Sequence, residues 1–292
     1  MGKDEVEVSY GKLFEDVLLL SRAFAKRGLN RNDKVMFLSD NRYAWIVTDL
    51  AIMSLGAVTV PRGADTPTQE LSFIIENSEA TYLVIESDDL LEKHLEYVRD
   101  CKQIKSIFVM TSPEKHRIFS NMYSYSSLLT DRVISDDDIQ QFRLRGESIT
   151  PESLLTLIYT SGTTGMPKGV QLSHANVMHN IRYIPDIIGL TEEDRWLSIL
   201  PSWHIFERTA EYSALCIGSC LVYSSVKSFA QDLQDYKPTL VATVPRVWES
   251  LYTKVELAIR KKGKAAQVIF NTLVTVSSKY KRNLRMFRGH LP

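Results

Sequence analysis

Residues 156–174 read TLIYTSGTTGMPKGVQLSH, an apolar run that predicts a strand, followed by a glycine-rich loop. It places glycines, hydroxyl side chains and one lysine between two apolar runs. Glycine lets backbone N–H groups approach phosphate oxygens closely, and hydroxyl groups can donate hydrogen bonds to them. Because α/β sheets bind ligands beyond the carboxyl ends of their strands, a strand followed by this loop predicts a polyphosphate site. The residues expected to form it are Thr160, Ser161, Gly162, Thr163, Thr164, Gly165 and Lys168.

The loop differs from the two best-known phosphate-binding motifs. Its glycines and lysine do not have the Walker A spacing G-x-x-x-x-G-K-[ST], and they do not fit G-x-G-x-x-G. Composition alone favours a surface turn rich in Ser, Thr and Gly. The dense order T-S-G-T-T-G-M-P-K-G-V favours the phosphate site instead, with Lys168 supplying a positive charge and Pro167 stiffening the chain before it.

Short β-branched runs alternate with amphipathic stretches along most of the chain. Residues 12–29, KLFEDVLLLSRAFAKRGL, have apolar side chains on one helical face and a glycine near their end, which predicts a helix. Runs such as KVMFLS at 34–39 and LLTLIYT at 154–160 predict buried strands. The alternation predicts right-handed βαβ crossovers. The expected fold class is therefore α/β, with doubly wound parallel sheets and flanking helices.

The expected organisation divides the chain near residue 150. Residues 1–150 are expected to form a first α/β subdomain, and residues 151–292 part of a second one that carries the glycine-rich loop. Residues 111–152 are polar and show no sustained period, which predicts a linker or a surface insertion. The consecutive residues Asp136, Asp137 and Asp138 lie within it. They indicate a helix start rather than a metal site, because adjacent carboxylates do not face one another and acidic residues suit a first turn.

Composition narrows the class of protein. Among 292 residues, 35 Lys and Arg side chains balance 35 Asp and Glu side chains, so the net charge predicts no attraction to nucleic acid. No run approaches the ~18–20 apolar residues that span a bilayer, and no signal peptide opens the chain. Three cysteines do not make a disulfide framework, and Cys216 and Cys220 are expected to be buried free thiols. We therefore expect a cytoplasmic protein.

Residues 254–288 form a strongly basic segment. They contain ten Lys or Arg residues and one acidic residue, Glu256. Basic amphipathic helices can lie on anionic membrane surfaces, so peripheral membrane contact is one interpretation. A solvated helical hairpin is the alternative, and the sequence slightly favours the hairpin.

Residues 159–170, YTSGTTGMPKGV, resemble the phosphate-binding signature of the adenylate-forming, or AMP-binding, acyl-activating enzymes. Two later segments, LPSWHIFERTAEY at 200–212 and TVPRVWESLY at 243–252, are similar to the long-chain fatty acid synthetase branch of that family. The resemblance runs through nearly the whole chain and is weakest at residues 111–152.

This resemblance implies a reaction with ATP, Mg²⁺ and coenzyme A. A long-chain fatty acid carboxylate would attack the α-phosphate of ATP, and the acyl-adenylate would then pass to a thiol. The Thr160–Lys168 loop would hold the β- and γ-phosphates, Thr160 would help to ligate Mg²⁺, and His204 would line the acyl and nucleotide pocket. Without the resemblance, a core position is the better interpretation of His204. Trp203 and Phe206 would wall an alkyl channel, although aromatic side chains at this spacing are more often part of a core.

The remaining charged residues of these segments are interpreted as structural. Glu207 and Arg208 are expected to form one local pair, and Arg246 and Glu249 another. The family's adenine-binding Tyr-Gly-x-Thr-Glu segment and its late catalytic lysine are absent from the sequence. The resemblance therefore implies an N-terminal fragment of a larger synthetase, with no complete set of catalytic residues.

Four other functions compete with fatty acid–CoA ligation. Acyl carrier protein could replace coenzyme A as the acceptor, and the sequence does not separate the two. A non-catalytic nucleotide-binding or interaction module could retain the loop without the reaction. A phosphotransferase is disfavoured, because Walker spacing and the H-R-D and D-F-G triplets are absent. A metal hydrolase is disfavoured more strongly still, since the six histidines include no H-x-x-x-H pair.

Overall fold

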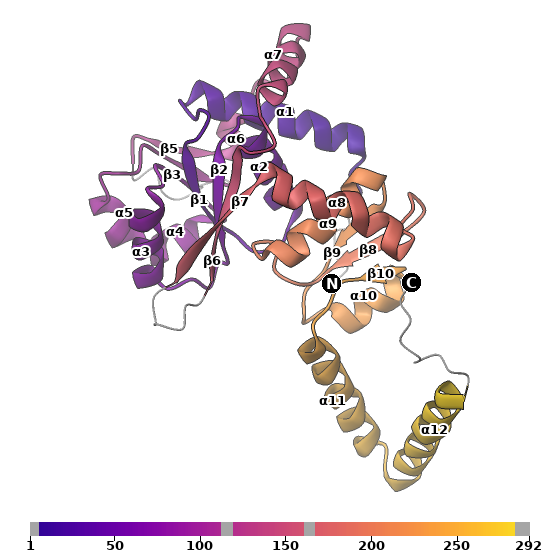
Figure 1. The fold of residues 1–292 in the computed structure, drawn as a ribbon. Helices are drawn as coiled ribbons and strands as arrows, with labels where there is room; N and C mark the ends of the chain where they lie inside the picture. Colours follow the sequence, from indigo (N-terminus) through magenta and orange to yellow (C-terminus); the bar gives the residue numbers. More distant parts are fainter. Residues whose placement is uncertain (1–5, 112–118, 161–166, 284–292) are drawn as a thin grey trace. The chain divides into compact units, whose positions relative to one another are not determined.

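The computed structural model describes residues 6–111, 119–160 and 167–283. The chain divides into two units, which are described separately: residues 1–242 form the larger unit and residues 243–292 the smaller one. Within the described part of the chain, the larger unit contains two β-sheets and the smaller unit a pair of helices (Figure 1).

The larger sheet has seven strands in the order β5-β4-β3-β1-β2-β6-β7. The strands are β1 (Lys34–Leu38), β2 (Val58–Arg62), β3 (Tyr82–Ile85), β4 (Ser106–Val109), β5 (Met122–Ser124), β6 (Leu154–Thr160) and β7 (Lys168–Ser173). Neighbouring strands pair in parallel except β6 and β7, which form an antiparallel hairpin. Helices cover both faces, as parallel sheets require, so the predicted α/β class is confirmed.

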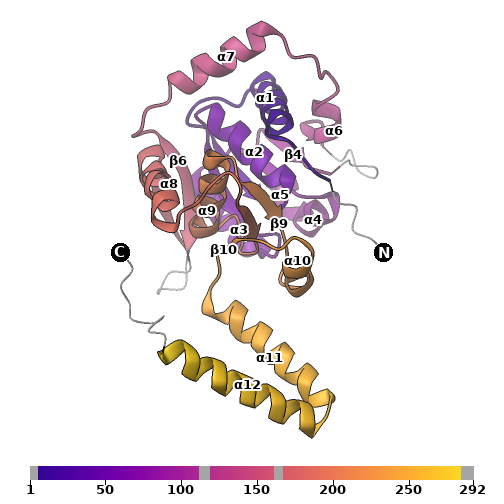
Figure 2. The same cartoon turned by 90° about the vertical axis from the view of Figure 1, so that its right-hand side faces the viewer.

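Alternate residues of the central strand β1 enter two different cores, as the period of a strand dictates. Val35 and Phe37 join the core beneath one set of helices, whereas Met36 and Leu38 join the core on the opposite face. The first face is covered by α1 (Tyr10–Lys26) and α2 (Tyr43–Ser54), which lie side by side (Figure 2). The second face is covered by α3 (Thr68–Ser78), α4 (Asp88–Lys93) and α5 (Leu95–Asp100).

A smaller parallel sheet has the order β10-β8-β9. It is formed by β8 (Arg195–Ser198), β9 (Cys220–Tyr223) and β10 (Leu240–Val241). In sequence, α8 (His174–Ile188) precedes β8, and α9 (Ile205–Ile217) and α10 (Phe229–Asp235) lie between the three strands. Helix α9 packs on both sheets, because Tyr212 joins the first large core while Ala210 and Ala214 pack with Trp196 of β8. The position of α9 therefore depends on both sheets.

The prediction differs from the structure at β7. The sequence analysis identifies no strand after the glycine-rich loop, but Lys168–Ser173 return along β6 as an antiparallel edge strand. Four of the six residues of β7 are exposed, so the strand shows no apolar alternation that could have revealed it.

The subdomain boundary expected at residue 150 stays a prediction. The strands β6 and β7 follow that residue and complete the larger sheet.

The polar segment 111–152 contains more regular structure than a linker. Besides β5, it holds α6 (Tyr125–Leu128) and α7 (Asp136–Glu147). Ser135 caps α7 and forms a capping box with Asp138, so the three aspartates do form a first helical turn. Asp138 also pairs with Arg22 of α1 at 2.9 Å. Because α7 buries no residue, its sequence carries no apolar period.

The smaller unit consists of α11 (Pro245–Lys261) and α12 (Lys264–Asn283), joined through Gly263 with a φ of +96°. The rings of Tyr252 and Phe270 approach to 6.4 Å between the two helices. Throughout the described ranges, no helix combines the length and apolar character needed to cross a membrane.

Candidate functional site

The predicted phosphate loop connects the two strands of the β6–β7 hairpin. Thr160 ends β6 and Lys168 begins β7, and the two residues are partners in the antiparallel register. Both are exposed. The other predicted phosphate-binding residues, Ser161, Gly162, Thr163, Thr164 and Gly165, lie outside the described residues. Their role stays a prediction, while the two residues that close the loop lie side by side.

A close backbone contact fixes the hairpin below this loop. The buried ring of Tyr159 lies over Gly169, and a Cβ atom at position 169 would stand 3.0 Å from Cζ of that ring. The Tyr159 hydroxyl donates a hydrogen bond to Oδ1 of Asn77 at 2.6 Å. A side chain at position 169 would therefore crowd the Tyr159 ring, and this buried ring anchors the hairpin next to its Thr160–Lys168 end.

A second loop, which precedes α9, reaches the same carboxyl edge of the sheet. Asn41, just beyond the end of β1, donates from Nδ2 to the carbonyl oxygen of Leu200 at 2.5 Å. Its Oδ1 accepts a hydrogen bond from the backbone N–H of Ser202 at 2.7 Å. One amide side chain therefore satisfies two backbone groups of the loop and holds it at the sheet edge.

Trp203 and His204 stand at the end of that loop. Their rings lie 4.0 Å apart between centroids, at an angle of 33°. Arg62, the last residue of β2, places its guanidinium 5.1 Å above the Trp203 ring and donates from Nη1 to the carbonyl oxygen of Tyr159 at 3.1 Å. Arg62 thus contacts both Tyr159, which precedes Thr160 in β6, and Trp203, which precedes His204.

His204 occupies the N-cap position of α9 and is exposed, so it is not a core histidine. Partial burial of its ring, and then the positive charge of Arg62, lower the pKa of His204 below its usual range. Its imidazole is therefore neutral at pH 7 and can exchange hydrogen bonds with a ligand. The placement of Thr160, Lys168 and His204 at one sheet edge agrees with the predicted pocket, and the binding role of each stays a prediction.

The predicted local pair between Glu207 and Arg208 is wrong. Arg208 instead forms a fully buried, bidentate ion pair with Asp49 of α2. Its Nη2 donates to Oδ1 at 2.6 Å and its Nε donates to Oδ2 at 2.9 Å. Adjacent residues of a helix point in different directions, whereas Asp49 lies across the helix packing interface. Sequence spacing gave no signal for this pair, because its members are 159 residues apart.

Further polar contacts surround the buried pair. Tyr212 donates a hydrogen bond to Oδ2 of Asp49, and Nη2 of Arg208 donates to Oγ1 of Thr59 in β2 at 3.0 Å. The guanidinium also lies 5.7 Å from the centre of the Trp45 ring. A buried charge pair is stable only when its remaining donors and acceptors are satisfied, and this cluster supplies most of those partners.

Glu207 and Glu211 form a second buried group on α9. Burial, reinforced for Glu207 by the charge of Glu211, raises the pKa of Glu207 to about 8, and burial raises the pKa of Glu211 to about 7. Ser198 and Ser202 donate hydrogen bonds to Oε1 of Glu211 at 2.7 and 2.6 Å. Ser198 also lies near Glu207, without completing a hydrogen bond of ordinary geometry. Glu207 is therefore mainly protonated at neutral pH.

Two further expectations are corrected. In the described part of α11, no ion pair joins Arg246 and Glu249, both of which are exposed on its first turns. Water competes with such surface pairs, so spacing alone does not create them. Cys216 and Cys220 are free thiols as expected, but both are exposed rather than buried, because one lies near the end of α9 and the other on an edge strand.

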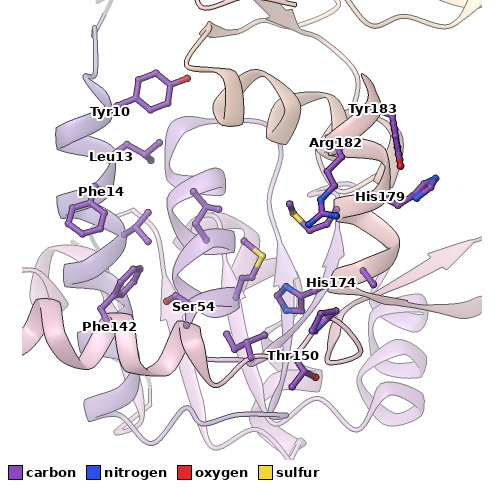
Figure 3. A pocket seen from close by; sticks show the side chains of 18 residues that line it. Tyr10, Leu13, Phe14, Ser54, Phe142, Thr150, His174, His179, Arg182 and Tyr183 are labelled. Carbon is purple, nitrogen blue, oxygen red and sulfur yellow. The ribbon is translucent and has the colours of Figure 1, made fainter. Parts of the chain in front are cut away.

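A cavity of about 830 Å³ lies between α1, α2, α7 and α8 (Figure 3). Its apolar lining comes mainly from the first three of these helices, and α8 contributes His174, His179 and Arg182. Thr160, Lys168 and His204 do not line it. The cavity is therefore distinct from the site at the carboxyl edge. The described residues also contain no group of three or more His, Cys, Asp or Glu side chains suited to a metal ion.

Comparison with known proteins decides the family. A family profile described as "AMP-binding enzyme" matches residues 2–287. The chain belongs to the AMP-binding enzyme family. The match covers nearly the whole sequence, so the resemblance seen in the glycine-rich loop is confirmed.

Two curated relatives of this AMP-binding chain are fatty acid ligases. It is 28% identical over 294 residues to a chloroplastic long-chain-fatty-acid–[acyl-carrier-protein] ligase of Arabidopsis thaliana, covering 97% of this chain and 40% of the relative. It is 30% identical over 242 residues to a long-chain-fatty-acid–CoA ligase of Mycobacterium tuberculosis, covering 81% and 38%. The chain thus spans about two fifths of the length of these relatives.

Solved structures support the fold of this AMP-binding chain. A red-emitting luciferase from Phrixothrix hirtus superposes with a TM-score of 0.70 at 20% identity, covering 84% of this chain and 46% of the luciferase. An o-succinylbenzoate CoA synthetase from Bacillus subtilis, in complex with its acyl-adenylate intermediate, gives a TM-score of 0.64 at 22% identity, covering 87% and 60%. At these identities the likeness establishes the fold.

The buried pair offers a direct test of what holds α9 in place. We expect Arg208→Met to lower the free energy of unfolding by about 3–5 kcal/mol, because it leaves the Asp49 carboxylate buried without its counter-charge. Asp49→Leu combined with Arg208→Met should cost clearly less than the sum of the two single substitutions. Urea denaturation of the three variants measures both effects.

Lys34→Met provides the control for this cycle, because Lys34 pairs with Glu79, whose side chain is 81% exposed. That substitution should change the free energy of unfolding by less than about 1 kcal/mol. Additive costs for Asp49→Leu and Arg208→Met would contradict the assignment of a coupled buried pair.

Proposed function

We propose that this protein activates a long-chain fatty acid with ATP, forming an acyl-adenylate, and transfers the acyl group to the thiol of coenzyme A. The observation that carries the proposal is the convergence of Thr160, Lys168 and His204 on one edge of the larger sheet, in a chain of the AMP-binding family. The fatty acid ligases among its relatives support the substrate class.

In this proposal the hairpin loop binds the β- and γ-phosphates of ATP. The Lys168 side chain supplies positive charge beside the pyrophosphate that leaves, and hydroxyl groups of the loop donate hydrogen bonds to phosphate oxygens. Mg²⁺ is usually held by phosphates, water and one or two protein oxygens, so the Thr160 hydroxyl suits it as a protein ligand. The ion would neutralise phosphate charge; the hairpin would hold the phosphates in a fixed position.

His204 and Trp203 would border the place where the fatty acid carboxylate meets the α-phosphate. A neutral imidazole can donate to an oxygen of either reactant without adding a charge. Trp203 offers an apolar surface beside it, and Phe206, which is 59% exposed, extends that surface. Their use as walls of an alkyl channel is part of the proposal.

The acceptor has one specific alternative. The Arabidopsis thaliana relative is a ligase to acyl carrier protein, so a carrier-protein thiol could replace that of coenzyme A. The two acceptors share the adenylation step, and that step is the one tested first. A non-catalytic nucleotide-binding module is the outcome that remains if adenylation is absent.

A cytoplasmic location is proposed from the sequence alone.

The smaller unit is proposed to contact a membrane surface. Its helices expose an apolar row, including Ile269 and Leu273 with 60% and 63% of their surfaces accessible. Lys261, Lys262 and Lys264 surround the turn between α11 and α12. Exposed apolar side chains combined with basic ones suit an anionic lipid surface, where a fatty acid would be concentrated.

Exchange of radiolabelled pyrophosphate into ATP tests adenylation. The protein at its natural length should catalyse exchange that requires palmitate, and acetate should not replace it. Lys168→Ala should lower kcat by about 10²-fold or more, because the charge that stabilises the leaving pyrophosphate is removed. Lys34→Ala, at the opposite edge of the same sheet, is the control and should leave exchange unchanged.

Exchange supported by acetate alone would contradict the long-chain assignment. A folded protein that binds ATP without exchange on either acid would contradict adenylation and favour the non-catalytic module.

Sedimentation with lipid vesicles tests the membrane proposal. The protein should sediment with vesicles containing phosphatidylserine and much less with vesicles of phosphatidylcholine alone. The double variant Ile269→Ser and Leu273→Ser should reduce that binding by roughly tenfold, since each loses buried apolar area at the lipid surface. Val133→Ser, which changes a 75% exposed valine of the larger unit, is the control. Equal sedimentation of the double variant and the control would refute the proposal.

A further inference from the structure

We propose that Arg62 is a positioning residue that fixes Trp203, and through it His204, relative to the end of β6. The inference rests on the proposed function only where it assigns His204 to the substrate pocket. The positioning itself follows from contacts of Arg62, Gly63 and Trp203 within the larger unit.

The guanidinium of Arg62 has three attachments. Nη1 donates to the carbonyl oxygen of Tyr159 at 3.1 Å, and Nη2 forms an ion pair with Glu70 of α3. Its third contact is the face of the Trp203 ring, 5.1 Å from Cζ to the centroid. The side chain of Arg62 is only 15% exposed, so all three contacts are made in a largely dry environment. Cation–π attraction is strongest where the cation is desolvated.

Gly63 fixes the Trp203 ring from the backbone side. A Cβ atom at position 63 would stand 2.7 Å from Nε1 and 3.0 Å from Cε2 of Trp203. No side chain could be added at that distance without moving the indole. Arg62 and Gly63 are consecutive residues at the end of β2, and together they define a seat for Trp203.

The seat determines where His204 lies. Its ring packs on Trp203 at 4.0 Å between centroids, and the same residue begins α9. Because β6 and α9 come from distant parts of the sequence, some contact must set the spacing between Thr160 and His204. Arg62 touches the backbone of one segment and the aromatic ring of the other. Catalytic groups lose much of their effect when they are displaced by about 1 Å, so such a connection matters for a reaction at this edge.

The competing explanation is that Arg62 only stabilises the fold through Glu70. The two explanations differ in what happens to the His204 ring when Arg62 is changed. A purely structural ion pair would alter the unfolding temperature without moving His204, whereas a positioning residue would move the imidazole in a protein that remains folded.

Nuclear magnetic resonance of the full chain, labelled with ¹³C-histidine, tests the proposal. His204→Asn identifies the His204 signal, and the ring current of Trp203 should shift the signal of its Hε1 proton. In Arg62→Gln and in Gly63→Ala, most of that ring-current shift should be lost, because the Trp203 indole moves relative to the His204 ring. Arg62→Lys should restore little of it, since an ammonium group keeps the charge but not the planar fork. Unfolding temperatures confirm that each variant is folded.

Arg31→Gln is the matched control. Arg31 also donates to a backbone carbonyl oxygen, that of Ser148 at 2.9 Å, but it precedes β1 at the opposite edge of the sheet. The same change of charge there should leave the His204 signal in place. An unchanged His204 signal in folded Arg62→Gln and Gly63→Ala would overturn the proposal.

Pyrophosphate exchange separates this inference from the proposed function. If Arg62 positions a substrate-binding His204, Arg62→Gln should lower kcat roughly tenfold or more while the KM for ATP changes little. A changed His204 signal in Arg62→Gln with an unchanged kcat would show that the position of His204 does not matter for the reaction, and would overturn that part of the proposal. Absence of exchange in the unmodified protein would count against the proposed function, and the His204 signal would still decide whether Arg62 fixes the ring.

Discussion

A buried ion pair between Asp49 and Arg208 fixes the helix on which the candidate site depends. Asp49 belongs to α2, which covers the larger sheet, and Arg208 belongs to α9, which also packs on the smaller sheet. Both side chains are fully buried, so neither charge can turn to water if the other is lost. The pair gains its stability from geometry, because the guanidinium meets both carboxylate oxygens and Tyr212 donates a further hydrogen bond.

Once α9 is fixed, its first residues have little freedom. Asn41 holds the loop that precedes the helix, and Gly63 leaves room for Trp203 against the end of β2. The adjoining hairpin is fixed separately by the close contact of Tyr159 with Gly169. The candidate site is therefore assembled from strand ends that the sheet brings together, and the hairpin strands that carry Thr160 and Lys168 are anchored by the buried Tyr159 ring.

Much of this architecture could be predicted from the sequence, because most strands and helices have a strong apolar period. The strand β1 is an uninterrupted buried run, and α1 has one apolar face. The exceptions are elements without such a period: β7 is mostly exposed, and α7 buries nothing. The phosphate-binding role of the glycine-rich loop stays a prediction from its residue order, since glycine, hydroxyl groups and lysine suit phosphate oxygens chemically.

The partners of the charged residues could not be predicted in the same way. Spacing suggested that Arg208 pairs with its neighbour Glu207, but the true partner is Asp49, and only the fold brings those two together. Arg62 gave no sequence signal either, because its role depends on contacts with Tyr159 and Trp203, far away in the chain. Family membership confirms the resemblance that the loop sequence carries, while these contacts fix the described residues around it.

Hydrogen–deuterium exchange with and without ATP and Mg²⁺ tests the central claim, that the carboxyl edge of the larger sheet is the nucleotide-binding site. Peptides covering residues 159–170 and 199–206 should become protected when ATP is added, and peptides of α1 and α8 that line the separate cavity should not. Protection confined to α1 and α8, with no change at the hairpin or before α9, would contradict the account.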